Sequence, residues 1–168
     1  MSEDVFAQEK ILARYAAGPD ELEKAIAGLK ETDFDLALQP ERWSIRQLVH
    51  HVADGDDIWK LAIKAAVGNP GGSYSVMWYW EQPQDDWVSG WDYAGRDVAA
   101  SLALFRVNRQ HTIALVNHFP DCWEDEVEMP WIDGNQRRFS VGAILESQGN
   151  HALGHIEDIL AVRARYSI

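Results

Sequence analysis

Residues 43–67 read WSIRQLVHHVADGDDIWKLAIKAAV and carry the clearest helix signal in the chain. Ser44 and Gln47 have the Ser-x-x-Gln spacing of a capping box, which marks the start of a helix. The apolar residues that follow recur every three or four positions, as they do on one face of a helix. Residues 68–72, Gly-Asn-Pro-Gly-Gly, are all helix breakers. The pattern therefore predicts a helix over Ile45–Val67.

Three further segments repeat their apolar residues with the period of a helix. The first is divided by Gly18-Pro19, so that Glu3–Ala17 and the stretch 22–29 form either one kinked helix or two short ones. The other two segments are Gly95–Phe119 and Val141–Arg165. Four long helices are typical of a helix bundle.

A short β-hairpin is predicted before the last helix. Asp133-Gly134, a strong turn signal, lies between short apolar patches within Glu128–Phe139. Ser140 follows and is a suitable N-cap for the last helix. Because the chain has 168 residues and no second compact pattern, we expect one domain over residues 1–168 with an all-α fold.

An aromatic segment connects the second and third long helices. The connection, Ser73–Ala94, contains four of the eight tryptophans, which are Trp78, Trp80, Trp87 and Trp91. Long connections within a compact domain are usually functional or locally packed. The aromatic side chains of the segment 78–91 therefore either fill the core or line the mouth of a pocket.

Charge and cysteine content exclude several classes of protein. Lys and Arg number 15 against 27 Asp and Glu, a net charge of −12. This excess argues against nucleic acid and against an anionic membrane surface as partners. Cys122 is the one cysteine, so an intramolecular disulfide is impossible. Met1–Lys10 lacks the pattern of a signal peptide and no stretch is apolar enough to span a membrane, so we expect a cytoplasmic protein.

Two histidines share the apolar face of the last predicted helix. His151 and His155 are one turn apart, in line with Ile144, Gln148 and Ile159. Two imidazoles at this spacing can direct a nitrogen at one ion, and neutral imidazole suits zinc, nickel, copper or iron. Such a pair also arises by chance on an apolar helix, where each histidine simply forms a hydrogen bond in the core.

The helix over Ile45–Val67 offers a third imidazole. Helical geometry places His51 on the flank of the apolar stripe and His50 nearly opposite its centre. His51 is therefore the better inward candidate, and His50 is a surface residue or a supporting neighbour of the ligands. Three histidines leave open positions on a small cation, which is the pattern of a catalytic metal site.

Other polar residues have two interpretations each. Asp54, three residues after His51, either orients an imidazole N–H or is a solvated carboxylate. Gln148 either holds a water or substrate or bonds to a neighbouring helix. His111 and His118 flank the core on another helix. Acidic neighbours make Cys122 a poor nucleophile.

The histidine segments resemble the signatures of the DinB/YfiT-like superfamily. The stretch 43–54, Trp-Ser-Ile-Arg-Gln-Leu-Val-His-His-Val-Ala-Asp, is similar to the segment that opens the second helix of that family, and His151–Ile156 to its terminal His-x-x-x-His-Ile motif. The resemblance implies an up-down-down-up four-helix bundle, frequently a homodimer. It also implies that nickel, zinc or another divalent ion binds to His51, His151 and His155.

The resemblance implies two kinds of activity on a small-molecule substrate. Some members of the family are thiol-dependent S-transferases or isomerases that use a low-molecular-weight thiol, and others are metal-dependent hydrolases. In this chain, water or a thiolate at the metal would be the reacting group, with Asp54, Gln148 and His50 as supporting candidates. The alternatives are a non-catalytic metal- or ligand-binding dimeric bundle and a plain structural bundle with histidines in its core.

Overall fold

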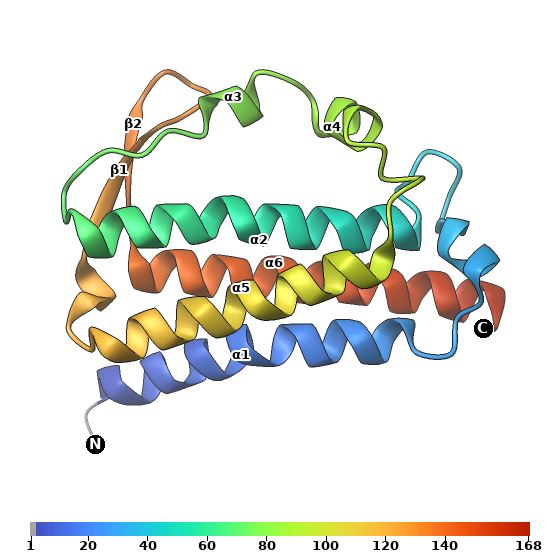
Figure 1. Ribbon diagram of the computed structural model, residues 1–168, viewed down its shortest axis with the longest axis horizontal. Coiled ribbons are helices and arrows are strands. Elements are labelled where there is room, and N and C mark those ends of the chain that lie inside the picture. The colour runs from blue at the N-terminus through green and yellow to red at the C-terminus, as the bar shows by residue number, and fades with distance from the viewer. Residues whose placement is uncertain (1–2) are drawn as a thin grey trace.

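Four long helices form a bundle in the computed structural model, which describes residues 3–168 (Figure 1). They are α1 (Glu3–Ile26), α2 (Ile45–Gly68), α5 (Val98–His118) and α6 (Val141–Tyr166). Helices α1 and α6 run in one direction, and α2 and α5 run in the other (Figure 1). The expected up-down-down-up bundle is therefore confirmed. Residues 1–2 of the predicted domain lie outside the described residues.

The neighbours within the bundle are set by this topology. Helix α1 packs against α5 and α6, and α2 packs against the same two helices. Buried apolar side chains form one core cluster near the hairpin, which includes Ile63, Val127 and Ile144. A second cluster, which includes Ile45 and Phe105, fills the other end. Because α2 has two partner helices, two sides of α2 are buried.

Predicted helix caps are present at both helices that carry the candidate ligands. At the start of α2, the Ser44 hydroxyl accepts a hydrogen bond from the backbone N–H of Gln47 at 3.3 Å, and the Gln47 side chain accepts one from the backbone N–H of Ser44 at 2.8 Å. The Ser140 hydroxyl accepts from the Ala143 backbone at the start of α6, at 3.2 Å. Capping sets where these helices begin, and hence which residues face inward.

Helix α1 continues through Gly18-Pro19 as one helix, which decides between the two alternatives drawn from the sequence. Pro19 has no N–H, so it leaves the carbonyl oxygen of Tyr15 without its helical donor. The guanidinium of Arg109 on α5 donates to that oxygen at 2.7 Å. A side chain at Gly18 would collide with the same guanidinium. Gly18-Pro19, which the sequence offered as a possible helix break, is therefore the place where Arg109 of α5 packs against α1.

The connection between α2 and α5 holds two short helices, α3 (Met77–Trp80) and α4 (Gln84–Gly90), where the sequence indicated only a loop. Their aromatic residues pack on one another: the Tyr79 ring stacks on that of Trp87 at 5.8 Å, and Trp87 lies 4.9 Å from Trp91. The connection passes along α2 (Figure 1). These local ring contacts stabilise helices that are too short to form alone.

The predicted hairpin is formed by β1 (Glu126–Pro130) and β2 (Gln136–Ser140), which pair antiparallel with Glu126 opposite Ser140. Gly134 has a φ of 80° in the turn, a conformation that favours glycine. Two 3-10 helices, η1 (Glu31–Asp35) and η2 (Cys122–Glu124), complete the elements within residues 3–168. Over that range, no helix combines the length and apolar character that crossing a membrane would require.

Candidate metal centre

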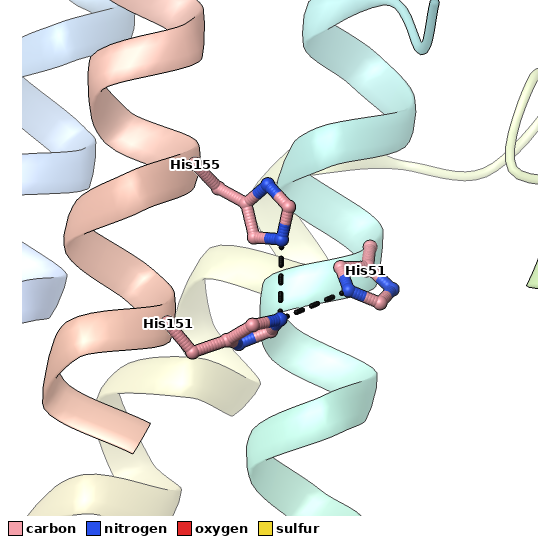
Figure 2. Close-up of side chains that lie close together, drawn as sticks. All are labelled: His51, His151 and His155. Atoms are coloured by element: carbon pink, nitrogen blue, oxygen red, sulfur yellow. Dashed lines mark hydrogen bonds between the residues drawn. The ribbon is translucent and has the colours of Figure 1, made fainter. Parts of the chain in front are cut away.

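Three histidines from two antiparallel helices converge on one point (Figure 2). His151 and His155 project from α6 toward His51 of α2. One ligand atom from each lies within 4.8 Å of the other two. The Nε2 atom of His151 is 3.1 Å from Nε2 of His51 and 3.1 Å from Nε2 of His155. The structure thus brings together the three residues that the helical periodicity selected.

Two of the three nitrogen separations, those from His151, fit a shared divalent ion. Nitrogens at about 2.0–2.1 Å from one ion lie about 2.9 Å apart at right angles and about 3.3 Å apart at the tetrahedral angle. The two observed separations of 3.1 Å fall between these values. Gly55, one turn along α2 from His51, leaves space here: a Cβ at this position would be 3.6 Å from Cε1 of His151.

The cluster keeps its imidazoles neutral. Burial, and then repulsion from His151 and His155, lowers the pKa of His51 to about 3. Burial, followed by His155, lowers the pKa of His151 to about 4. Burial also lowers the pKa of His155, which the carboxylate of Asp158 opposes. A neutral imidazole has a free lone pair, which is the form that binds a metal.

Trp43 forms a cover over two of the histidines. Its ring meets that of His51 edge to face at 4.6 Å and stacks on that of His155 at 6.4 Å. The indole N–H donates to Asp85 on α4 at 2.6 Å. The sequence gives one signal for this contact, since Trp43 lies directly before the Ser44 cap and about two helical turns before His51.

Asp158 is an acidic neighbour of the three-histidine cluster. Its Oδ2 atom is 3.6 Å from Nδ1 of His155, three residues earlier on α6. Metal-binding histidines commonly direct their second nitrogen at a carboxylate, which fixes the ring. The His-x-x-Asp spacing of His155 and Asp158 is the sequence signal for this neighbour.

Asp54 has neither of its two alternative roles, since it orients no imidazole and its side chain, paired with Arg96, is largely buried. Its two carboxylate oxygens accept hydrogen bonds from Arg96 at 2.6 and 3.1 Å. Arg96 lies just before α5, and the long connection from α2 brings it back beside Asp54. A bidentate partner from a distant part of the chain cannot be inferred from spacing along one helix.

His50 is neither a surface residue nor a neighbour of the ligands. Its side chain is completely buried, and its Nδ1 atom is 2.7 Å from the hydroxyl oxygen of Ser101 on α5. The ring also lies against Tyr93, at 5.4 Å. The expectation failed because it assumed one buried side of α2, whereas α5 and α6 cover two. Burial lowers the pKa of His50.

Gln148 lies beside the cluster, as the inward stripe of α6 predicted. It is 4% exposed and lines a cavity together with His51 and His151. Its backbone carbonyl accepts a hydrogen bond from Arg109 at 2.8 Å. Its side-chain amide has no hydrogen-bond partner within residues 3–168, so the bond to a neighbouring helix, one of the two alternatives, is not formed there.

The remaining candidates lie away from the centre. His111 and His118 are exposed on α5, and the described residues provide no fourth histidine for the cluster. Cys122 is buried, and burial followed by Asp125 raises the pKa of its thiol. The thiol is therefore protonated at neutral pH, as its acidic neighbours led us to expect.

Comparisons with known proteins agree with this architecture. A model of the DinB superfamily matches residues 14–159. The structure of YfiT from Bacillus subtilis superposes with a TM-score of 0.81 over 99% of this chain and 90% of that one, at 19% sequence identity. That protein is described as a probable metal-dependent hydrolase with an unusual four-helix bundle topology. None of the curated proteins compared with the chain matches it.

Proposed function

This chain belongs to the DinB superfamily, and from that premise we propose that it binds one divalent metal ion through His51, His151 and His155 and hydrolyses a small molecule there. The observation that carries the proposal is the convergence of three neutral imidazoles, with Nε2 of His151 at 3.1 Å from Nε2 of both His51 and His155. Three protein ligands leave positions open for water and substrate, unlike the closed four-ligand sites that serve structure alone.

Zinc and nickel are the ions that we expect, because both bind imidazole nitrogen well. When bound, such an ion acts as a Lewis acid that polarises a carbonyl group and lowers the pKa of water to about 7. The side chains of the protein have separate tasks. The three histidines hold the ion, Asp158 faces the outer nitrogen of His155, and Trp43 shields the rings of His51 and His155 from solvent.

Hydrolysis is the first candidate because the structural relative is described as a probable metal-dependent hydrolase. Transfer from a low-molecular-weight thiol is the second, and one observation favours it. Besides the cavity next to His51 and His151, a second cavity of about 320 Å³ opens beside His155, with Arg42 and Asp85 in its lining. The first cavity shares Gln84 with the second, so two reactants could reach the centre from different sides.

Metal analysis of the purified protein tests the proposal. We expect the wild type to bind one zinc or nickel ion per chain and to unfold at a higher temperature with the ion than after treatment with a chelator. His151→Ala should lose both properties. His111→Ala is the matched control, because His111 is an exposed histidine on another helix. Stoichiometric metal in His151→Ala, or none in the wild type, would refute the site.

Activity assays distinguish a hydrolase or an S-transferase from a non-catalytic binding protein. Zinc- or nickel-loaded protein should release phenol from phenyl acetate without added thiol if it is a hydrolase. Consumption of an electrophilic aromatic compound only with a thiol present would establish the S-transferase instead. Metal binding without either reaction would favour the non-catalytic bundle. The homodimer remains a prediction, which sedimentation equilibrium can check.

A further inference from the structure

The cavity next to His51 and His151 has a defined size and composition. Its volume is about 190 Å³, and it lies between α2, α6 and the connection that contains α3. Five aromatic and aliphatic side chains line it: Ile58, Trp59, Val76, Tyr79 and Trp80. Gly55 adds room beside His151, because it has no side chain to fill the space.

None of the residues that line this cavity carries a charge. Its polar lining consists of the two histidines, Gln84, Ser147 and Gln148. The cavity beside His155 differs, since Glu41, Arg42, Asp85 and Asp158 line it. A charged group that moved from water into the first cavity would lose its hydration without gaining an ion pair from the wall. The cavity therefore selects an uncharged molecule, or the uncharged part of one.

Gln148 is 4% exposed and lines the cavity, and its side-chain amide forms no hydrogen bond within residues 3–168. The indole nitrogen of Trp80 is buried and likewise has no partner there. The amide N–H groups of Gln148 can donate, so a carbonyl oxygen on a ligand would form the hydrogen bond that this side chain lacks.

The volume limits the apolar part of the ligand. An apolar cavity of about 150 Å³ holds one benzene molecule. The cavity beside His151 is slightly larger, at about 190 Å³, which suits one ring with a small substituent. Rings of Tyr79, Trp59 and Trp80 provide the aromatic surface against which such a group can pack.

We propose that this cavity binds the uncharged, single-ring part of the substrate, an ester or amide whose carbonyl group lies beside Gln148. This assignment rests on the proposed hydrolysis and names its substrate class. In the reaction, the oxygen of water bonds to the carbonyl carbon, and the bond from that carbon to the leaving oxygen or nitrogen breaks. The leaving group takes up a proton, so that a carboxylic acid and an alcohol or amine are formed.

Calorimetric titration with benzamide tests the assignment on the full chain in its metal-free form. Benzamide has one ring and a neutral carbonyl group, benzoate carries a charge, and 2-naphthamide has two fused rings. We expect benzamide to bind at one site, benzoate to bind at least about tenfold more weakly, and 2-naphthamide to bind more weakly than benzamide. Removal of the metal matters, because a carboxylate can bind an ion directly and would hide the selectivity of the wall.

A substitution in the wall gives a second readout. Gln148→Leu should weaken benzamide binding by about fivefold, the effect of losing one hydrogen bond, while toluene binds at least as well as to the wild type. Gln110→Leu, the same change at an exposed position of α5, should alter neither ligand. Equal affinity of metal-free protein for benzoate and benzamide, or no response of benzamide to Gln148→Leu in a folded variant, would overturn the assignment.

The outcome of the benzamide titration can be distinguished from the outcome of the test for hydrolysis. Selective benzamide binding by a protein that hydrolyses no ester would support the cavity assignment and refute hydrolysis. Hydrolysis of charged or two-ring esters, together with a failure to bind benzamide, would refute the cavity assignment and leave the hydrolase in place. Phenyl acetate turnover that benzamide inhibits competitively in wild-type protein, and about fivefold less strongly in Gln148→Leu, would support both.

Discussion

A guanidinium nitrogen of Arg109 lies 2.7 Å from the carbonyl oxygen of Tyr15, the oxygen that Pro19 deprives of its helical donor. The same side chain donates to the Gln148 carbonyl at 2.8 Å and to the Asp56 carboxylate at 3.0 Å. One residue of α5 therefore contacts all three other long helices. Its bond to α6 is made one turn before His151, so Arg109 fixes the position of a candidate metal ligand from the interior of the bundle.

Arg109→Met should be strongly destabilising. Asp56 is buried, and burial raises its pKa to about 6 against the opposing effect of Arg109. Removal of one partner from a buried ion pair leaves an unpaired charge and costs about 3–5 kcal/mol. Urea denaturation measures this loss in the free energy of unfolding. Addition of Asp56→Leu should restore part of it, because the second change removes the unpaired carboxylate.

Arg106→Met is the matched control for that measurement. Arg106 lies three residues earlier on α5 and forms ion pairs with Asp20 and Glu23 of α1, whose side chains are largely exposed. Exposed ion pairs contribute little, so this variant should be far less destabilised than Arg109→Met. Equal losses in the two variants would show that burial of the Arg109 ion pair is unimportant.

Acid should destabilise the metal-free protein through its histidines. The pKa values of His51, about 3, and His151, about 4, are below the value of about 6.5 for an unfolded chain. Between these limits the unfolded chain binds more protons, so stability falls as the pH falls. The loss at pH 5 is on the order of 2 kcal/mol for each histidine.

Asp56 has the opposite effect over part of this range. Its pKa is raised to about 6, so the folded state binds the proton first and gains stability as the pH falls through 6. A comparison of wild type with His51→Leu removes this contribution, because both proteins contain Asp56. In the presence of a chelator, urea denaturation at pH 7.5 and 5 should show a smaller loss for His51→Leu, and parallel losses would contradict the prediction.

His50→Gln and His51→Gln should separate structure from metal binding at adjacent positions. His50 contacts Ser101 at 2.7 Å in the core, so His50→Gln should lower the free energy of unfolding by about 1–3 kcal/mol with its metal content unchanged. His51→Gln should lose the metal. Elemental analysis of both proteins checks the assignment, which fails if a folded His50→Gln variant is free of metal.

Gly55→Ala should make the protein more stable and its cavity smaller. Alanine favours a helix by about 0.8–1.0 kcal/mol over glycine, and its Cβ would be 3.6 Å from His151, an ordinary contact. We therefore expect a higher melting temperature with weaker benzamide binding. Gly154→Ala is the control, because no atom lies within 4 Å of a Cβ there. It should be stabilised without a change in binding.

The inward positions of the three histidines could be predicted because they follow from local helix geometry. His51, His151 and His155 lie on helices whose starts are fixed by Ser44 and Ser140, and periodicity then determines which side chains face inward. The same logic predicted the inward position of Gln148. Where a residue depends only on its own helix, the sequence was sufficient.

Residues whose role depends on distant partners were not predicted. Arg109 and Asp56 are 53 positions apart, and each alone has the pattern of a solvated charge on a helix. Arg96 likewise pairs with Asp54, which is 42 positions away in the sequence, so Asp54 does not orient an imidazole. A signal did exist for Arg109: Pro19 within a helical pattern implies a free carbonyl, which a buried donor must satisfy.

Helices α2 and α5 run in the same direction, so a long segment must connect the end of α2 to the start of α5. Helix α2 has 24 residues and is about 36 Å long, so the chain must travel back that distance before α5 begins. The returning segment supplies Tyr79, Trp80 and Gln84 to the cavity, and the bundle supplies the three histidines. Mutations in the returning segment should therefore change the shape of the cavity while they leave the three-histidine cluster of the bundle in place.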